Sequence, residues 1–301
     1  MQKGIDGFLD YLRYERNRSE NTVESYRRDL EAFECYFSTL DSELTFATVD
    51  TDIVRDWMEY MLEQGNRATS VARRLSALKT YYRYLLARGY VEHDPAHIVY
   101  RPKTDRPLPQ FVREEQMDQL LDHTEWGDTY EAQLERTIVL MFYETGMRLS
   151  ELTSLNDSSV DYVRSEIRVH GKGNKQRAIP FGSELAEALR SYTALRDAEV
   201  VHKNTTALFR TQRGGRMTNP QVREIVRRQL STVTNLKKRS PHVLRHTFAT
   251  AMFNNGANIE NVQKLLGHER LSTTEIYTHT SFEQLKQAYS EAHPRSGTPQ
   301  E

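Results

Sequence analysis

Two stretches near the end of the chain are the most informative: SPHVLRHTFAT (residues 240–250) and LLGHERLSTTEIYTH (residues 265–279). The chain has sixteen tyrosines, so Tyr277 gains its interest only from the cationic residues His242, Arg245 and His268 that precede it. A phenol has a pKa of about 10 and is a weak nucleophile near neutral pH. It attacks a phosphodiester only when fixed positive groups stabilise the phenolate and the charge on the phosphoryl oxygens.

Two further cations lie upstream, each in a turn that contains glycine. Arg148 follows Gly146 in YETGMRLSELTSL, where the chain turns between two expected helices. Lys172 lies in VHGKGNKQRAIP, between two short segments that alternate apolar and polar residues, and is therefore expected at the tip of a β-hairpin. Each also has an ordinary explanation: Arg148 as a surface partner of Glu151, and Lys172 as a solvated hairpin lysine.

The histidines raise the hypothesis of a zinc site, which their spacing does not support. His242 and His246 are four residues apart on a helix expected to begin at Ser240, so both could ligate one ion. The metalloprotease pattern needs Glu directly after the first histidine, and this chain has Val243 there. No metal site is predicted. A helix-capping role for His268 and a core position for Tyr277 stay open as alternatives.

The net charge of -1 says little, but the charges are segregated along the chain. Residues 64–91 contain six Lys or Arg and no acid, and residues 210–245 contain ten Lys or Arg and one acid. Residues 114–135 contain eight acids and no Lys or Arg. Two basic segments favour a polyanion such as nucleic acid, with the acidic segment left to solvent.

Aromatic residues strengthen the nucleic-acid hypothesis, because Tyr81, Tyr82 and Tyr84 interleave with the first basic segment. The candidate DNA-binding residues are the basic side chains of both segments, namely Arg67, Arg73, Arg74, Lys79, Arg83, Arg213, Arg216, Arg223, Lys237 and Lys238.

Apolar periodicity divides the chain into two parts. Residues 1–99 have apolar residues at three- and four-residue spacing, with Tyr82 among those expected to face inward, and capping residues at Ser19 and at Asp50 or Thr51. This pattern predicts a bundle of four helices. Residues 100–110, YRPKTDRPLPQ, hold three prolines and are expected to be a linker. Residues 111–301 mix helices with the hairpin strands. The expected fold class is therefore mainly α with a small β-sheet: a helical bundle followed by an α+β domain.

Composition excludes several other classes of protein. No uninterrupted apolar run approaches the roughly 20 residues that span a bilayer. The single cysteine, Cys35, precludes an intrachain disulfide and is expected to be a small core residue. These features predict no membrane association and a cytoplasmic location.

As a set, TGMRLSEL, GKGNKQR, HVLRHTFAT and LLGHERLSTTEIYTH resemble the catalytic motifs of the tyrosine recombinases, in that family's order and spacing. The nearest likeness is to the Xer-type members, which act on chromosome or plasmid dimers, and it extends over nearly the whole chain. The resemblance implies a SAM-like core-binding domain in residues 1–99 and a catalytic domain in residues 111–301, with a C-terminal helix exchanged between protomers. It also implies the catalytic set: Arg148, Lys172, His242, Arg245 and His268 activate the phosphate, and Tyr277 is the nucleophile.

The resemblance further implies a covalent route. Tyr277 would displace a 5′-hydroxyl and leave a 3′-phosphotyrosyl link that preserves the energy of the bond, so no metal, nucleotide or other cofactor is expected. The implied partners are a double-stranded DNA recombination site and a homo- or hetero-tetramer of recombinase protomers on two sites. Dependence on a DNA translocase is an open point. The alternatives are a transposon or integron-type integrase, a relaxing enzyme of the type IB topoisomerase kind, and a DNA-binding regulator without catalysis.

Overall fold

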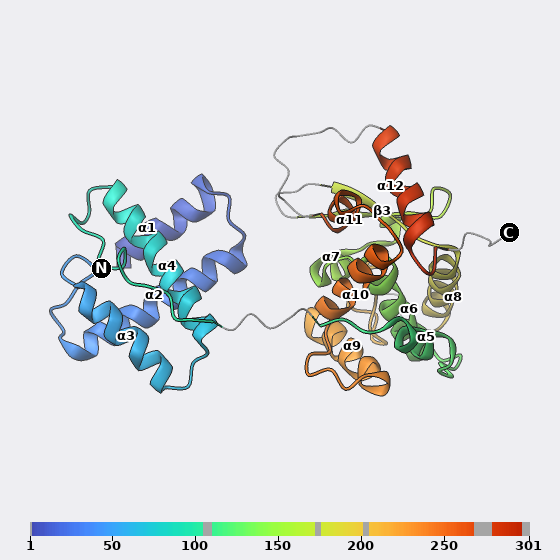
Figure 1. Ribbon diagram of the computed structural model, residues 1–301, viewed down its shortest axis with the longest axis horizontal. Coiled ribbons are helices and arrows are strands. Elements are labelled where there is room, and N and C mark those ends of the chain that lie inside the picture. Colours follow the sequence, from blue (N-terminus) through green and yellow to red (C-terminus); the bar gives the residue numbers. More distant parts are fainter. Residues whose placement is uncertain (1, 105–109, 172–175, 201–204, 268–278, 297–301) are drawn as a thin grey trace. The chain divides into compact units, whose positions relative to one another are not determined.

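The chain divides into two compact units, Met1–Pro107 and Leu108–Glu301 (Figure 1). The computed structural model describes residues 2–104, 110–171, 176–200, 205–267 and 279–296. Helices dominate both units and one small sheet lies in the second, which confirms the predicted fold class. Among the described helices, none is long and apolar enough to cross a membrane.

The first unit is a helical bundle around an aromatic core. Asp50 accepts the backbone N–H of Ile53 at 2.9 Å, and Ser19 accepts that of Thr22, so both predicted helix caps are present. Phe8, Phe33 and Trp57 are among the side chains that fill the space between the helices. The helices are α1 (Gln2–Asp10), the π-helical turn η1 (Tyr11–Glu15), α2 (Glu20–Leu40), α3 (Thr51–Glu63) and α4 (Ala68–Ala87).

Two sequence interpretations are wrong in this unit. Tyr81, Tyr82 and Tyr84 lie on the buried face of α4, and the Tyr82 hydroxyl donates to the carbonyl oxygen of Phe46 at 3.1 Å. They build the core and therefore give no support to stacking on nucleic-acid bases. Cys35, expected in the core, is exposed, because the periodicity of α2 turns its large aromatic residues inward and this position outward.

The second unit is organised around α6 (Tyr130–Thr145). Every residue of α6 from Thr137 to Thr145 is buried, as expected of a helix enclosed on all sides. The helices α8 (Ser183–Glu199), α9 (Asn219–Val233) and α10 (Pro241–Asn254) pack against it, and α5 (Glu114–Asp122) packs against α9.

The small sheet is antiparallel with the order β1-β2-β3. Its strands are β1 (Val160–Asp161), β2 (Glu166–His170) and β3 (Gln176–Pro180), preceded by α7 (Leu149–Ser154) and the short 3-10 helix η2 (Asp157–Ser159). Ile167 pairs with Ile179 and both are buried, which confirms the predicted hairpin. Two residues are too few to show the alternation of a strand, so β1 was not expected. The turn with Lys172 lies outside the described residues.

The last helices, α11 (Ile259–Leu266) and α12 (His279–Ala292), complete a small core with α10. Leu285, Tyr289 and Ala292 of α12 are buried against a cluster that includes Phe248 and Met252, so α12 packs on its own chain (Figure 1). Exchange of this helix between protomers stays a prediction. Tyr277 falls between α11 and α12, outside the described residues.

Buried polar groups tie α12 to α6. Oε2 of Glu144 accepts the Tyr289 hydroxyl at 3.0 Å and the backbone N–H of Gly182 at 2.9 Å. Its Oε1 is buried with no hydrogen-bond partner among the described residues. Burial raises the pKa of Glu144 to about 8. Beyond the helix, Nε2 of buried His293 lies 3.1 Å from the carbonyl oxygen of Tyr143, and burial lowers the pKa of His293 to about 4.

We expect Glu144→Gln to change how thermal stability depends on pH. Because the folded-state pKa near 8 exceeds the ordinary value of 4.5, the folded state retains a proton that the unfolded state loses within this window. The stability contributed by this carboxyl is therefore complete below the unfolded-state pKa and declines as pH rises towards 8. Since an amide does not titrate, the melting temperature of the variant should fall less than that of the wild type between pH 5 and 8. Glu187→Gln, on the exposed side of α8, is the control. Parallel profiles for wild type and Glu144→Gln would contradict ionisation of Glu144 in this window.

Candidate active site

Three arginines from different elements converge on the C-terminal end of α11. Arg177 of β3, Arg245 of α10 and Arg148 before α7 donate, in that order, to the carbonyl oxygens of residues 265–267. The N–O distances are 3.0, 2.6 and 2.8 Å. The last carbonyl oxygens of a helix receive no hydrogen bond from within the helix, and they lie at the negative end of its dipole. Nearby cations therefore stabilise them. The end of α11 thus gathers three guanidinium groups in one place.

Two glycines allow this close approach. Gly146 ends α6 and Gly267 ends α11, with φ angles of 56° and 66° in the left-handed region. A Cβ atom on Gly146 would lie 2.4 Å from the Phe248 ring, and one on Gly267 would lie 3.0 Å from Nη1 of Arg177. The carbonyl oxygen of Gly146 also accepts Nη1 of Arg245 at 2.7 Å. A side chain at Gly146 would therefore overlap Phe248, and one at Gly267 would require the guanidinium of Arg177 to move.

A single buried carboxylate, Glu151, holds two of the arginines. Its Oε1 accepts Nη1 of Arg148 at 2.9 Å and Nη1 of Arg177 at 2.6 Å, while Oε2 accepts the backbone N–H of Arg148 at 2.7 Å and Nη2 of Arg177 at 2.9 Å. Burial alone would raise the pKa of Glu151, but the bonds and charge of Arg177, and then those of Arg148, hold that pKa below its usual value. The pairing of Arg148 with Glu151 is confirmed, though within a buried cluster and not on an outer surface.

Among the described residues of this cluster, positive charge exceeds negative charge. Three guanidinium groups surround one carboxylate, and Arg245 has no acidic partner among the described residues. Burial, followed by the charges of Arg148 and Arg177, lowers the pKa of Arg245 to about 10, so the side chain is still a cation near neutral pH. Arg148 is partly exposed, and its Nε–H is not used in a hydrogen bond with any described residue. A bound phosphate would relieve this repulsion and match the planar forks of the guanidinium groups.

The other predicted catalytic residues are described only in part. His242 is exposed on α10, one turn before Arg245, and its ring lies edge-on to His246 with centroids 4.7 Å apart. Lys172, His268 and Tyr277 lie outside the described residues. Their described neighbours are the β2–β3 hairpin, Gly267 at the end of α11, and α12, which begins at His279. The structure therefore brings Arg148 and Arg245 together, places His242 one turn before Arg245 on α10, and leaves the positions of Lys172, His268 and Tyr277 untested.

Arg177 was overlooked in the sequence, and Glu151 was considered only as a surface partner. A signal for Arg177 was present: it lies two residues before Ile179 on β3, so the two side chains point to the same face. An arginine on the inward face of a strand implies a buried partner. Glu151, three residues after Arg148, is that partner.

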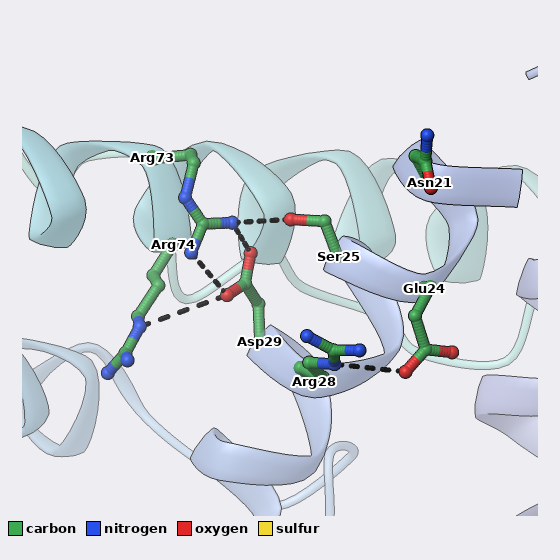
Figure 2. Close-up of a pocket in the computed structure, with 7 residues that line it drawn as sticks. All are labelled: Asn21, Glu24, Ser25, Arg28, Asp29, Arg73 and Arg74. Carbon is green, nitrogen blue, oxygen red and sulfur yellow. Dashed lines mark hydrogen bonds and ion pairs between the residues drawn. The ribbon is translucent and has the colours of Figure 1, made fainter. Parts of the chain in front are cut away.

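In the first unit, a hollow of about 280 Å³ between α2 and α4 gathers predicted DNA-binding residues (Figure 2). Arg73 and Arg74 line it with Arg28, which the sequence analysis had not selected. Arg73 is held in place by Ser25, at 2.7 Å, and by the buried carboxylate of Asp29. Nε of Arg74 lies 3.8 Å from Oδ1 of Asp29 and has no hydrogen-bond partner among the described residues.

Two other predicted DNA-binding residues, Lys79 and Arg216, donate hydrogen bonds to backbone carbonyl oxygens of the protein itself. Nζ of Lys79 donates to the carbonyl oxygens of His97 and Val99, at 3.1 and 2.8 Å. Nη1 of Arg216 donates to the carbonyl oxygens of residues 153 and 155, at the end of α7, at 2.9 and 2.8 Å. Contact with DNA through these two would compete with the internal bonds. The remaining candidates are exposed: Arg67, Arg83, Arg213, Arg223, Lys237 and Lys238.

Comparison with known proteins matches both units to one family. Residues 110–284 match the family model described as "Phage integrase family", and residues 5–89 match "Phage integrase, N-terminal SAM-like domain". The chain is 39% identical over 298 residues to tyrosine recombinase XerC of Azotobacter vinelandii, covering 98% of this chain and 97% of the relative. It is 38% identical over 295 residues to tyrosine recombinase XerC of Oceanobacillus iheyensis, covering 97% and 96%.

Solved structures show the same fold. The XerH site-specific recombinase bound to a palindromic difH substrate aligns with a TM-score of 0.71 at 22% identity, over 91% of this chain and 81% of that one. The Tn1549 transposon integrase in complex with a circular intermediate DNA aligns with a TM-score of 0.73 at 19% identity, over 93% and 97%. With the full-length likeness to the XerC proteins, these matches place the chain among the Xer-type tyrosine recombinases of the phage integrase family, site-specific enzymes that cut and rejoin DNA with a tyrosine nucleophile.

Proposed function

We propose that this recombinase resolves chromosome or plasmid dimers, and that Tyr277 is the residue that joins to DNA. The observation that carries the proposal is the pair Arg148 and Arg245, fixed at the end of α11 with more positive charge than Glu151 neutralises. The segment that follows contains His268 and Tyr277. The XerC relatives, similar over their whole length, support dimer resolution as the setting.

The proposed chemistry assigns one role to each catalytic candidate. Arg148 and Arg245 bind the nonbridging oxygens of the scissile phosphate, and His268 donates a further hydrogen bond. The Tyr277 oxygen bonds to phosphorus while the bond to the 5′-oxygen breaks. Lys172 gives that leaving oxygen its proton, and His242 assists proton transfer at the tyrosine. The 5′-hydroxyl of a second strand then attacks the phosphotyrosine and releases Tyr277, so no external energy source is needed.

The covalent link provides the direct test. Fragmented genomic DNA is incubated with the protein, denatured and digested, and the attached nucleotides are sequenced and their linkage determined. A link through the 3′-phosphate at a defined sequence is expected, whereas attachment through a 5′-phosphate would refute the mechanism. Relaxation of supercoiled plasmids that lack the mapped site would favour the topoisomerase-like alternative. Mapped sites confined to the ends of mobile elements would favour an integrase of the transposon or integron kind.

We further propose that the working form is a tetramer on two sites, made of this chain alone or with a second recombinase, in the cytoplasm where such DNA lies. Related recombinases solved with DNA support a duplex as the partner. Exchange of α12 between neighbours would join the protomers, and would require its contacts with α10 and α11 to be remade on another copy.

For the first unit, we propose that the hollow between α2 and α4 faces the DNA backbone. Arg74→Gln should weaken binding to duplex DNA and reduce the slope of log Kd against log salt by about 1, because one phosphate contact is lost. Fluorescence anisotropy at several salt concentrations measures both quantities. Arg55→Gln is the matched control, since Arg55 is an exposed arginine on α3 paired with Asp52 at 2.7 Å. Equal slopes for wild type and Arg74→Gln would remove Arg74 from the interface.

A further inference from the structure

We propose that Arg177 is a positioning residue for DNA cleavage: it occupies the Glu151 carboxylate and so keeps the guanidinium of Arg148 available to the scissile phosphate. This inference rests on the proposed function, in which Arg148 and Arg245 hold that phosphate. Arg177 itself does not touch the substrate in this proposal.

Arg177 and Arg148 share the two acceptor oxygens of Glu151 unequally. Arg177 takes both oxygens with a two-bond fork, at 2.6 and 2.9 Å. Arg148 reaches the same oxygens with its backbone N–H and a single side-chain nitrogen. The side chains of Arg177 and Glu151 are only 8% and 2% exposed, so water does not compete strongly for these bonds. With four donors around two oxygens, the carboxylate has little capacity left for a second side-chain bond from Arg148.

Loss of Arg177 would change the competition for Arg148. If the two hydrogen bonds from Arg177 were lost, the buried carboxylate would bond another donor, because an unsatisfied buried charge is costly. Arg148 is the nearest candidate, since one of its terminal nitrogens already bonds Oε1. A two-bond fork between Arg148 and Glu151 would use the donors that a phosphate needs and would offset the charge of Arg148. Arg177 thus prevents Glu151 from forming a two-bond contact with Arg148, the arginine proposed to bind the phosphate.

Arg177 also fixes the end of α11. Its Nε donates to the carbonyl oxygen of Leu265 at 3.0 Å, and its guanidinium lies where a side chain on Gly267 would be. One side chain therefore joins β3, which follows the Lys172 turn, to α7 and to the helix end that precedes His268. Both effects act on the geometry around the phosphate and neither requires a contact with DNA, so cleavage should suffer more than binding.

The first test separates these two steps. Arg177→Gln and Arg177→Lys are compared with wild type for the single-turnover rate of adduct formation at saturating DNA, and separately for Kd. We expect the glutamine variant to cleave on the order of 10²-fold more slowly, as for the loss of one preorganised donor. Its Kd should stay close to that of the wild type. The lysine variant, which keeps the charge but not the fork, should be intermediate.

Arg168→Gln is the matched control. Arg168 lies on the adjacent strand β2 and also pairs with a buried glutamate, Glu166, at 2.9 Å, but it is not part of the α11 cluster. Its variant should cleave at the wild-type rate. An equal defect in Arg168→Gln would show that any lost ion pair in this sheet slows the enzyme, and would overturn a specific role for Arg177.

A double variant distinguishes positioning from simple structural support. In Arg177→Gln/Glu151→Gln, the group that would capture Arg148 is neutral, so the double variant should cleave faster than Arg177→Gln alone. A double variant that is equally slow or slower would overturn the mechanism.

Adduct formation by the wild type together with an unimpaired Arg177→Gln would refute this inference alone. A wild type that forms no adduct would refute the proposed function as well. If Arg177→Gln unfolds, as judged by its melting temperature, the test rests on Arg177→Lys. A wild-type cleavage rate in Arg177→Lys would show that the two-bond contact with Glu151 is not needed, and would refute the inference.

Discussion

We expect the replacement of Tyr277 by phenylalanine to abolish the covalent DNA adduct and to leave DNA binding close to the wild-type level. The substitution removes only the oxygen that would bond to phosphorus, so the affinity contributed by basic side chains along the duplex is preserved. A nicked duplex that lets the cleaved end diffuse away traps the adduct, which denaturing electrophoresis then detects. The expected effect is the largest predicted for this protein, because phenylalanine has no oxygen that could bond to phosphorus.

Tyr100→Phe is the matched control, since Tyr100 is 91% exposed and lies outside both cores. It should form the adduct normally. An adduct that survives in Tyr277→Phe would overturn the assignment, and peptide mapping of the trapped DNA would then identify the true nucleophile. The combination of no adduct and no DNA binding in Tyr277→Phe would also count against it, because the oxygen is proposed to act in chemistry and not in affinity.

Arg148→Lys should slow cleavage by about 10²–10³-fold, as expected when an oxyanion-stabilising donor is lost. Arg148 bonds Glu151 and the carbonyl oxygen of Gly267, and its Nε–H makes no hydrogen bond with any described residue. The three donors of an ammonium group have no planar fork, so lysine cannot keep both internal contacts and grip a phosphate as well. Single-turnover cleavage at saturating DNA measures the loss, with Kd measured in parallel.

Arg113→Lys is a close control for this substitution. Arg113 precedes α5 as Arg148 precedes α7, and the backbone N–H of Arg113 bonds Gln116 just as that of Arg148 bonds Glu151. Arg113 is exposed, and it makes no ion pair with any described residue. We expect wild-type cleavage from it. Near-normal cleavage by Arg148→Lys would mean that positive charge alone is sufficient at this position.

Local signals in the sequence were enough to predict most of the fold. Ser19, Asp50 and Gly146 mark helix ends because their side chains or backbone angles satisfy requirements set by a few neighbouring residues. The hairpin followed from the alternation around Ile167 and Ile179. The core position of Tyr82 followed from its spacing, but those of Tyr81 and Tyr84 did not, because a tyrosine serves equally well in a core or at a surface. Which side of α4 is covered depends on how the other helices pack against it.

For the candidate site, the motifs identified the two arginines but not how they are held. The partnership of Arg177 with Glu151 joins residues 26 positions apart. The bond from Tyr289 to Glu144 joins residues 145 positions apart. Pairings at such separations leave no periodic signal in one sequence, since they depend on the three-dimensional approach of β3 to α7 and of α12 to α6. An inward-facing arginine indicates that a partner exists, and only the fold identifies it.

The crowding of like charges at the end of α11 affects how altered versions of this enzyme should be judged. A folded domain that keeps guanidinium groups side by side is under electrostatic strain until a polyanion arrives. A change that neutralises Arg148 would lessen the repulsion on Arg245, which would offset part of the cost of losing the bonds of Arg148 to Glu151 and Gly267. High yield and an ordinary melting temperature are thus poor evidence of an intact catalyst, and recombination itself has to be measured.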